Sequence, residues 1–189
     1  MKKEAFPSNR FQQQFGLPSE RSRGKVRDHM HTWIQEFIQN SPFCVLATSD
    51  GNGRCDASPR GGKPGFVRVL SDKQLLIPDV AGNRLFQSFT NIESNNHVGL
   101  LFFIPGVNET ARVNGKATII AKNDLQNHGI ELSVFHPDDN AKLSQGILLE
   151  VEEAYGHCPR ALVFSNLWEP DLINNHIETS PISKRPSGV

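Results

Sequence analysis

The sequence lacks the marks of membrane, secreted and general nucleic-acid-binding proteins. No apolar run approaches the roughly 18 residues needed to cross a bilayer, and the N-terminus has no apolar core of a secretory signal. The 20 basic residues are balanced by 20 acidic ones, unlike the basic surface of a general nucleic-acid binder. Three cysteines without metal-ligand spacing fit a reducing compartment. We therefore expect a cytoplasmic protein with no membrane or nucleic-acid partner.

Common catalytic and nucleotide-binding signatures are also missing. There is no Gly-x-Gly-x-x-Gly segment, and Gly61-Gly62-Lys63 is followed by Pro64, where a phosphate-binding P-loop has serine or threonine. No His-Glu-x-x-His segment occurs, and the seven histidines are scattered. These absences leave no catalytic residue and no metal ligand to assign from motifs.

The length of 189 residues suits one domain with a sizeable core. Residues 1–27 are polar and aperiodic, and they predict an N-terminal arm that is either solvated or packed across a partner subunit. Residues 28–170 carry the periodic apolar segments of the domain. Residues 171–189 form a polar C-terminal tail, and we expect its end to be disordered.

Apolar segments of strand length and the turns between them predict mostly strands. The spacing of Met30, Ile34 and Phe37 predicts a helix over 28–40 with Asp28 as its cap. Short turns such as 49–53 favour hairpins and antiparallel pairing. Strands are predicted over 43–48, 54–59, 66–70, 74–77, 98–104, 111–121 and 146–154, and further helices over 82–91, 123–135 and 158–165. The fold class is thus β-rich α+β, a small barrel with flanking helices.

Three segments, 56–65, 77–84 and 110–115, each combine an arginine with a glycine no more than three residues away. A guanidinium suits the geometry of phosphate, and glycine lets backbone amides approach a ligand closely. The pattern predicts a phosphate-bearing cofactor held by Arg60, Arg84 and Arg112.

Two of these segments lie on predicted strands. Ser58, Arg60 and Gly61 offer a hydroxyl, a guanidinium and an accessible backbone, although a β-bulge with an exposed arginine would have the same sequence. Arg112 is a second candidate, and a surface arginine in a cross-strand pair is the alternative.

The third segment, Gly82-Asn83-Arg84, is placed at a predicted helix start. Unpaired amides and the helix dipole favour an anion there, while Asn83 could equally be a simple cap. Further along, Trp168 either covers a cofactor ring or pins the C-terminal segment to the core.

Residues from about 43 to 121 resemble the flavin-binding core of the pyridoxamine-phosphate oxidase-like proteins, in particular its small FMN-dependent members. The pieces that carry the resemblance are Asp56-x-Ser-Pro-Arg-Gly, Pro64-Gly-Phe66, Ile77-Pro-Asp79, Gly82-Asn-Arg84, Asn91-Ile92, Val98-Gly-Leu-Leu-Phe102, Ile104-Pro-Gly106 and Arg112-Val-Asn-Gly115. The resemblance implies a split β-barrel homodimer with FMN at two sites along the interface.

The same resemblance implies roles for individual residues. Arg60 and its neighbours would line the flavin, Asn83 and Arg84 would hold its phosphate, and Arg112 would lie near the cofactor. It implies an FMN-dependent oxidoreductase acting on a small substrate, with reduced nicotinamide, NAD(P)H, as the simplest electron donor. A deazaflavin in place of FMN is also compatible with such a fold.

Two other functions stay open. One is a non-enzymatic flavin- or haem-binding module for storage or sensing. The other is a true pyridoxamine 5'-phosphate oxidase, which ranks last because the family's substrate-gripping Arg-Leu-His-Asp-Arg stretch has no equivalent here. The chain has Phe164-Ser-Asn-Leu-Trp168 near its end instead, and related small flavoproteins often have a basic residue where Phe164 stands.

Overall fold

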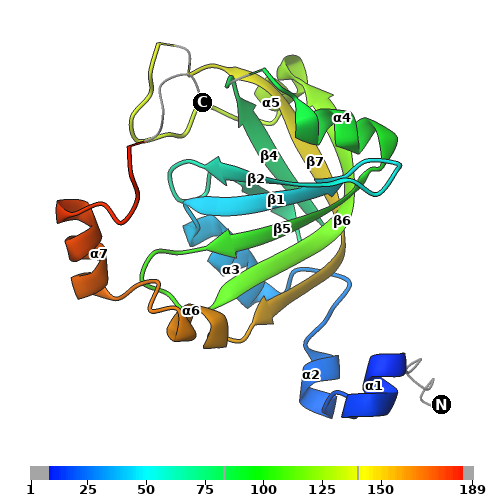
Figure 1. Ribbon diagram of the computed structural model, residues 1–189. Coiled ribbons are helices and arrows are strands. Elements are labelled where there is room, and N and C mark those ends of the chain that lie inside the picture. Colours follow the sequence, from blue (N-terminus) through cyan, green and yellow to red (C-terminus); the bar gives the residue numbers. More distant parts are fainter. Residues whose placement is uncertain (1–8, 83, 140, 185–189) are drawn as a thin grey trace.

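The computed structural model describes residues 9–82, 84–139 and 141–184. The helices are α1 (Arg10–Phe15), α2 (Glu20–Gly24), α3 (Thr32–Asn40), α4 (Gln87–Ser94), α5 (Lys122–Asn127), α6 (Arg160–Phe164) and α7 (Pro170–Glu178). The strands are β1 (Phe43–Ser49), β2 (Cys55–Gly61), β3 (Arg68–Ser71), β4 (Gln74–Val80), β5 (His97–Phe103), β6 (Thr110–Ala121) and β7 (Leu143–His157). Figure 1 shows the strands curled around α3.

The strands form one antiparallel sheet in the order β2-β1-β5-β6-β7-β4-β3. The sheet curls without closing, because β2 and β3 are its two edges. Residues 68–71 of the short strand β3 pair with residues 74–76 of β4. The later residues of β4 therefore extend past the end of β3. This confirms the predicted fold class, a split β-barrel with flanking helices, and the split lies between β2 and β4.

The core fills the inside of the curled sheet. α3 contributes Ile34, Phe37 and Ile38, which pack with strand residues such as Leu46 and Phe102. The helix begins at Thr32 with His31 before it, later than predicted. Asp28 does not cap it, because its carboxylate pairs with Lys73 at 3.0 Å and with His29 at 2.8 Å.

Several predicted boundaries are corrected by backbone geometry. The helix predicted from residue 82 begins at Gln87, because Arg84 (φ 60°) and Phe86 (φ 52°) adopt left-handed conformations. The helix predicted over 123–135 ends at Asn127, ahead of a left-handed Gly129 (φ 64°). The strand predicted over 146–154 extends at both ends, to Leu143–His157.

The arm and the tail contain short helices. α1, α2 and α7 bury no residue, and in Figure 1 they stand away from the sheet. α7 begins at Pro170, one residue before the predicted start of the polar tail at 171, so part of that tail is helical. The end of the tail lies outside the described residues, and the division into arm, domain and tail stays a prediction. No helix in the described ranges is long and apolar enough to cross a membrane.

Candidate functional site

The alternation of side chains along the strands divides the three candidate arginines between two faces of the sheet. Arg60 lies opposite Cys44, whose side chain is in the core. Arg112 lies opposite Leu101, which in turn lies opposite Val45, the next residue along β1 from Cys44. Directly opposed residues share a face and successive residues alternate. Arg60 therefore points to the inner side of the sheet, and Arg112 points to its outer, open face.

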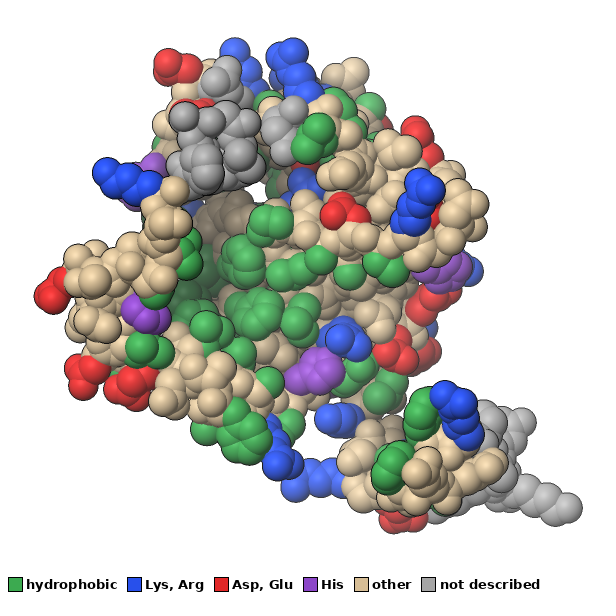
Figure 2. All heavy atoms as spheres, viewed as in Figure 1, with side chains coloured by type: hydrophobic (Ala, Val, Ile, Leu, Met, Phe, Trp, Pro, Cys, Tyr) green, Lys and Arg blue, Asp and Glu red, His purple; other side chains and the backbone are tan. Residues whose placement is uncertain are grey.

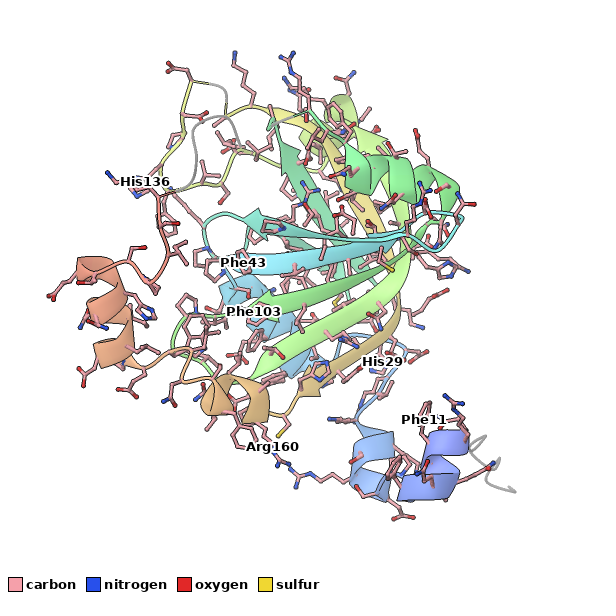
Figure 3. The ribbon with its side chains drawn as sticks, in the orientation of Figure 1. Phe11, His29, Phe43, Phe103, His136 and Arg160 are labelled. Carbon is pink, nitrogen blue, oxygen red and sulfur yellow. The ribbon has the colours of Figure 1, made fainter. Side chains whose placement is uncertain are left out.

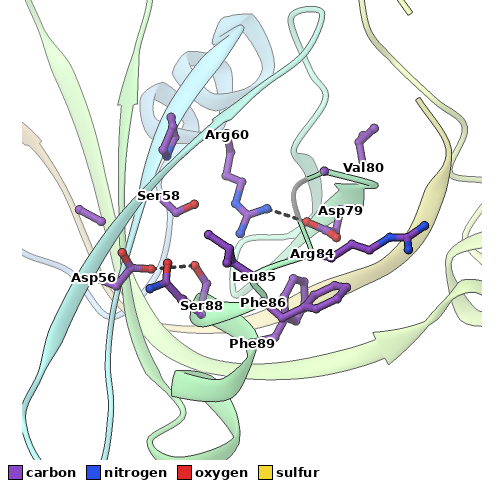
Figure 4. A pocket seen from close by; sticks show the side chains of 14 residues that line it. Asp56, Ser58, Arg60, Asp79, Val80, Arg84, Leu85, Phe86, Ser88 and Phe89 are labelled. Carbon is purple, nitrogen blue, oxygen red and sulfur yellow. Dashed lines mark hydrogen bonds and ion pairs between the residues drawn. The ribbon is translucent and has the colours of Figure 1, made fainter. Parts of the chain in front are cut away.

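A pocket of about 290 Å³ lies at the split, between β2, the end of β4 and the start of α4. We call it the seam pocket (Figure 4). It brings together three of the residues predicted from sequence, Ser58, Arg60 and Arg84. Asn83, a fourth, lies outside the described residues. Asp56, Asp79, Ser88 and Phe89 also line it.

A buried ion pair crosses the split inside this pocket. Arg60 Nη1 lies 2.6 Å from Asp79 Oδ1, and Ser144 Oγ donates to Asp79 Oδ2 at 3.2 Å. The side chains of Arg60 and Asp79 are only 19% and 9% exposed. Burial raises the pKa of Asp79 above its ordinary value, although Arg60 and Ser144 act in the opposite direction. Desolvation therefore outweighs the attraction of the pair.

Arg60 retains one hydrogen-bond donor without a partner among the described residues. Its Nε is buried and has no hydrogen-bond partner among the described residues. The guanidinium lies 5.9 Å from the ring centroid of Phe89, a distance that allows a cation–π contact. A buried donor without a partner is costly, so the geometry leaves Arg60 ready for an acceptor supplied by a ligand.

The loop before α4 completes the pocket. α4 has no side-chain cap, so the amides of its first turn are available near the pocket wall. Left-handed Arg84 and Phe86 cost about 1–3 kcal/mol each, and such strain is typical of ligand-binding segments. On the other wall, Ser88 Oγ donates to Asp56 Oδ2 at 3.3 Å.

The charges lining the seam pocket balance. Arg60 and Arg84 contribute two positive groups, while Asp56 and Asp79 contribute two negative ones. Arg84 is exposed, whereas Arg60 is held by Asp79. An anion that enters must therefore compete with Asp79 for Arg60.

The remaining predicted residues lie elsewhere. Gly61 ends β2 opposite Phe43 and does not line the pocket. Arg112 contacts Tyr155 through Nη1, 3.3 Å from the hydroxyl. Trp168 Nε1 donates to the Val107 carbonyl at 3.0 Å and so pins the C-terminal segment to the loop after β5. It lines a separate pocket of about 250 Å³ beside α6.

Sequence reasoning missed the acidic side of the site. Asp79 is in the Ile77-Pro-Asp79 piece, and its signal was a carboxylate on an otherwise apolar strand. Asp56 stood at the start of the first arginine–glycine segment and gave no sign of its pairing with Ser88. In residues 9–82, 84–139 and 141–184, no three histidine, cysteine or carboxylate side chains gather as a metal site.

The family model for pyridoxamine 5'-phosphate oxidase matches residues 30–158, more than half of the chain. The protein therefore belongs to the pyridoxamine 5'-phosphate oxidase family, as its resemblance implied. No curated protein matches it.

Several solved structures resemble this chain in backbone structure, although their sequence identity to it is low. HupZ of Group A Streptococcus is 18% identical, with a TM-score of 0.48 over 67% of this chain and 93% of its own. A putative pyridoxamine 5'-phosphate oxidase of Lactobacillus delbrueckii is 18% identical, with a TM-score of 0.47 over 68% of this chain and 95% of its own. A pyridoxamine 5'-phosphate oxidase-related, FMN-binding protein of Nostoc punctiforme is 19% identical, with a TM-score of 0.43 over 66% and 78%.

Proposed function

We propose that this protein is an FMN-dependent oxidoreductase that acts on a small molecule. The observation that carries the proposal is the buried Arg60, whose Nε has no partner in a pocket that also offers Arg84 and an uncapped helix. Family membership supports the same ligand class. When bound, FMN would supply hydride and electron transfer, and the chain would bind and orient it.

The seam pocket fits the phosphate end of the cofactor. Ser58, Arg60 and Arg84 would hold the phosphate together with the first-turn amides of α4. Sites for drug-sized ligands typically measure about 300–1,000 Å³, and the seam pocket measures about 290 Å³. It therefore suits one end of FMN, and the ring would lie outside it.

We further propose a homodimer. The open face carries an apolar patch formed by Phe43, Val45, Leu101 and Phe103. Figure 2 shows hydrophobic side chains gathered in a hollow on this side of the molecule, and Figure 3 shows Phe43 and Phe103 next to each other, with ring centroids 6.1 Å apart. We call this the open-face patch. Monomers rarely leave such a contiguous apolar surface uncovered.

The peripheral helices support a second copy as the occupant of this surface. Phe15 of α1, Phe164 of α6 and Ile177 of α7 are 77%, 72% and 76% exposed, so these short helices also present apolar side chains to solvent. Arg112 lies on the open face and Trp168 beside α6. Both side chains are therefore outside the seam pocket of their own chain. If Arg112 or Trp168 helps to hold the cofactor, it would contact the flavin bound by the second copy.

The electron donor and the compartment belong to the same proposal. A reduced nicotinamide, NAD(P)H, is the simplest donor to a flavin. Cys44, Cys55 and Cys158 are free thiols, which suits the reducing cytoplasm.

The absorbance spectrum of the purified protein tests the cofactor. We expect a flavin spectrum, release of FMN by acid, bleaching by NADPH and recovery of colour in air. A haem spectrum, or the release of a deazaflavin by acid, would show that the cofactor is not FMN. Flavin that is bound but never reduced by a nicotinamide would support the storage or sensing module instead.

Light scattering tests the dimer. We expect twice the chain mass of 21.0 kDa at micromolar concentration. Leu101→Asp should yield monomer because it places a charge in the open-face patch. Leu70→Asp, at a 37% exposed position on the edge strand β3, is the matched control and should stay dimeric. A wild-type monomer would refute this part of the proposal.

A further inference from the structure

Three basic side chains surround Tyr155 on the open face of the sheet. Lys25 follows α2, with Nζ 5.8 Å from the Tyr155 ring centroid. Arg112 of β6 lies 5.8 Å from the same centroid and reaches the hydroxyl at 3.3 Å. His157, at the end of β7, has its ring centroid 4.9 Å from that of Tyr155. We call Lys25, Arg112 and His157 the open-face cationic cluster.

The charges acting on His157 are all of one sign. Its pKa is lowered, first by burial and then by the positive charges of Arg112 and Lys25. Its Nε2 is buried and has no hydrogen-bond partner in the described part of the chain. Glu153, the next carboxylate on this face of β7, instead accepts a hydrogen bond from Asn114 at 2.9 Å.

The cluster forms no ion pair with a carboxylate of the described residues. The ion pairs there join other groups, and none involves Lys25, Arg112 or His157. The seam pocket differs, because Asp79 neutralises the buried Arg60 there. Like charges that face each other without a counter-ion raise the free energy of the site, and an anion between them would remove that repulsion.

The neighbours of the cluster indicate what kind of anion it would take. Arg112 lies directly opposite Leu101 on β5, which lies opposite Val45 on β1. This row runs from the cluster into the open-face patch, so a small ligand there meets basic groups at one end and apolar side chains at the other.

We infer that the open-face cationic cluster is a second anion-binding site, which takes the carboxylate or phosphate group of a small organic molecule. The ligand's anionic end lies between Arg112 and His157. Its apolar part lies beside Leu101, the residue of the open-face patch directly opposite Arg112, so the ligand would lie at the edge of the surface proposed to contact a second copy. Arg60 and Arg84 are in the seam pocket on the inner side of the sheet, so this site is separate from the phosphate site proposed for the cofactor. All of its residues come from one chain.

The experiment follows the imidazole of His157 by NMR during pH titrations of the full-length protein as purified. Titrations are run in chloride, in inorganic phosphate and in benzoate at matched ionic strength, and His157→Gln identifies the signal. An opposite charge within about 4–6 Å favours the charged form of a group. We therefore expect phosphate, benzoate or both to raise the pKa of His157 by about half a unit or more.

Variants separate this site from the seam pocket. Arg112→Gln should raise the pKa of His157 in chloride, because it removes a positive neighbour, and should abolish the response to anions. Lys25→Gln, at an exposed position, should have the same two effects to a smaller extent. Arg84→Gln is the matched control, because it removes an arginine from the seam pocket, and it should leave the His157 response unchanged.

The outcomes also identify the ligand group. A response to benzoate alone assigns a carboxylate with an apolar body, and a response to phosphate alone assigns a phosphate group. Two results would overturn the inference. One is a pKa of His157 that moves with neither anion. The other is a pKa that rises when FMN is added but not when phosphate or benzoate is added, because the anion would then be the cofactor's own phosphate. The spectrum of the bound cofactor is measured separately, so failure here leaves the proposed function untouched.

Discussion

The seam pocket and the open face lie on opposite sides of one sheet, and they differ in how the charge of their arginines is balanced. In the seam pocket, Arg60 is buried and neutralised by Asp79 at 2.6 Å. On the open face, Arg112 shares Tyr155 with Lys25 and forms no ion pair with a carboxylate of the described residues. A buried charge needs a counter-ion because desolvation is expensive, whereas a half-exposed charge is stabilised by water.

This difference separates two roles for arginine in one sheet. Arg60 links β2 to β4 across the split, so any ligand that binds it must displace or share a structural contact. Arg112 contacts Tyr155 on the neighbouring strand, and the backbone ladder between β6 and β7 already joins these two strands. Changes at Arg60 should therefore affect stability and binding together, and changes at Arg112 should affect binding alone.

The largest effect is expected for Arg60→Leu. Removing one partner of a buried ion pair leaves an uncompensated charge and typically costs about 3–5 kcal/mol. The free energy of unfolding, from urea denaturation, should fall by that amount near neutral pH. The double variant Arg60→Leu with Asp79→Asn should recover most of the loss, because no buried charge remains. Equal losses in the single and double variants would show that packing, and not charge, is what Arg60 supplies.

Gly115→Ala tests the β6–β7 ladder, which carries Arg112. The ladder between β6 and β7 shifts register between Asn114 and Gly115, and a Cβ on Gly115 would lie 1.9 Å from the Glu150 carbonyl oxygen. Backbone must move, at a cost of about 3 kcal/mol. Thermal unfolding should show this loss, and Gly24→Ala, with no atom within 4 Å of the added Cβ, should show almost none. A stable Gly115→Ala protein would mean that the bulge adjusts freely.

Arg84→Ala should weaken FMN binding about tenfold, which corresponds to about 1.4 kcal/mol. The effect is moderate because Arg84 is exposed at the pocket wall, and exposed charge pairs are screened by water. Riboflavin, which lacks the phosphate, should bind the variant and the wild type alike. Fluorescence titration with both flavins checks this, and an equal loss for both would assign Arg84 to the loop structure instead of the phosphate.

The smallest effect is a pH dependence at Asp79. Its pKa is raised by burial, so the folded state holds the protonated carboxyl better than the unfolded state does. The resulting stabilisation is present below the ordinary value of 3.8 and is lost as the pH rises through the raised pKa. Urea denaturation between about pH 3.5 and 6 should show wild-type stability falling relative to Asp79→Asn as pH increases. A rise would mean that the pair with Arg60 outweighs burial.

Much of the fold could be predicted from local patterns. Short apolar runs bounded by turn residues located most of the strands, because both signals lie within a few residues of each segment. The start of α4 could not be predicted in this way. Arg84 and Phe86 take left-handed conformations that neither residue type favours, so the loop is determined by its surroundings and not by local propensity.

The sequence by itself determined that three segments each combine an arginine with a nearby glycine, and this pattern predicted a phosphate-bearing ligand. Only the tertiary structure decided which of them meet. The curl of the sheet brings Arg60 to Asp79, 19 residues away along the chain, while strand alternation sends Arg112 to the opposite face. The physical reason is that a residue's position along a strand fixes which face of the sheet its side chain is on. The residues that it contacts across the split depend instead on where strands distant in the sequence end.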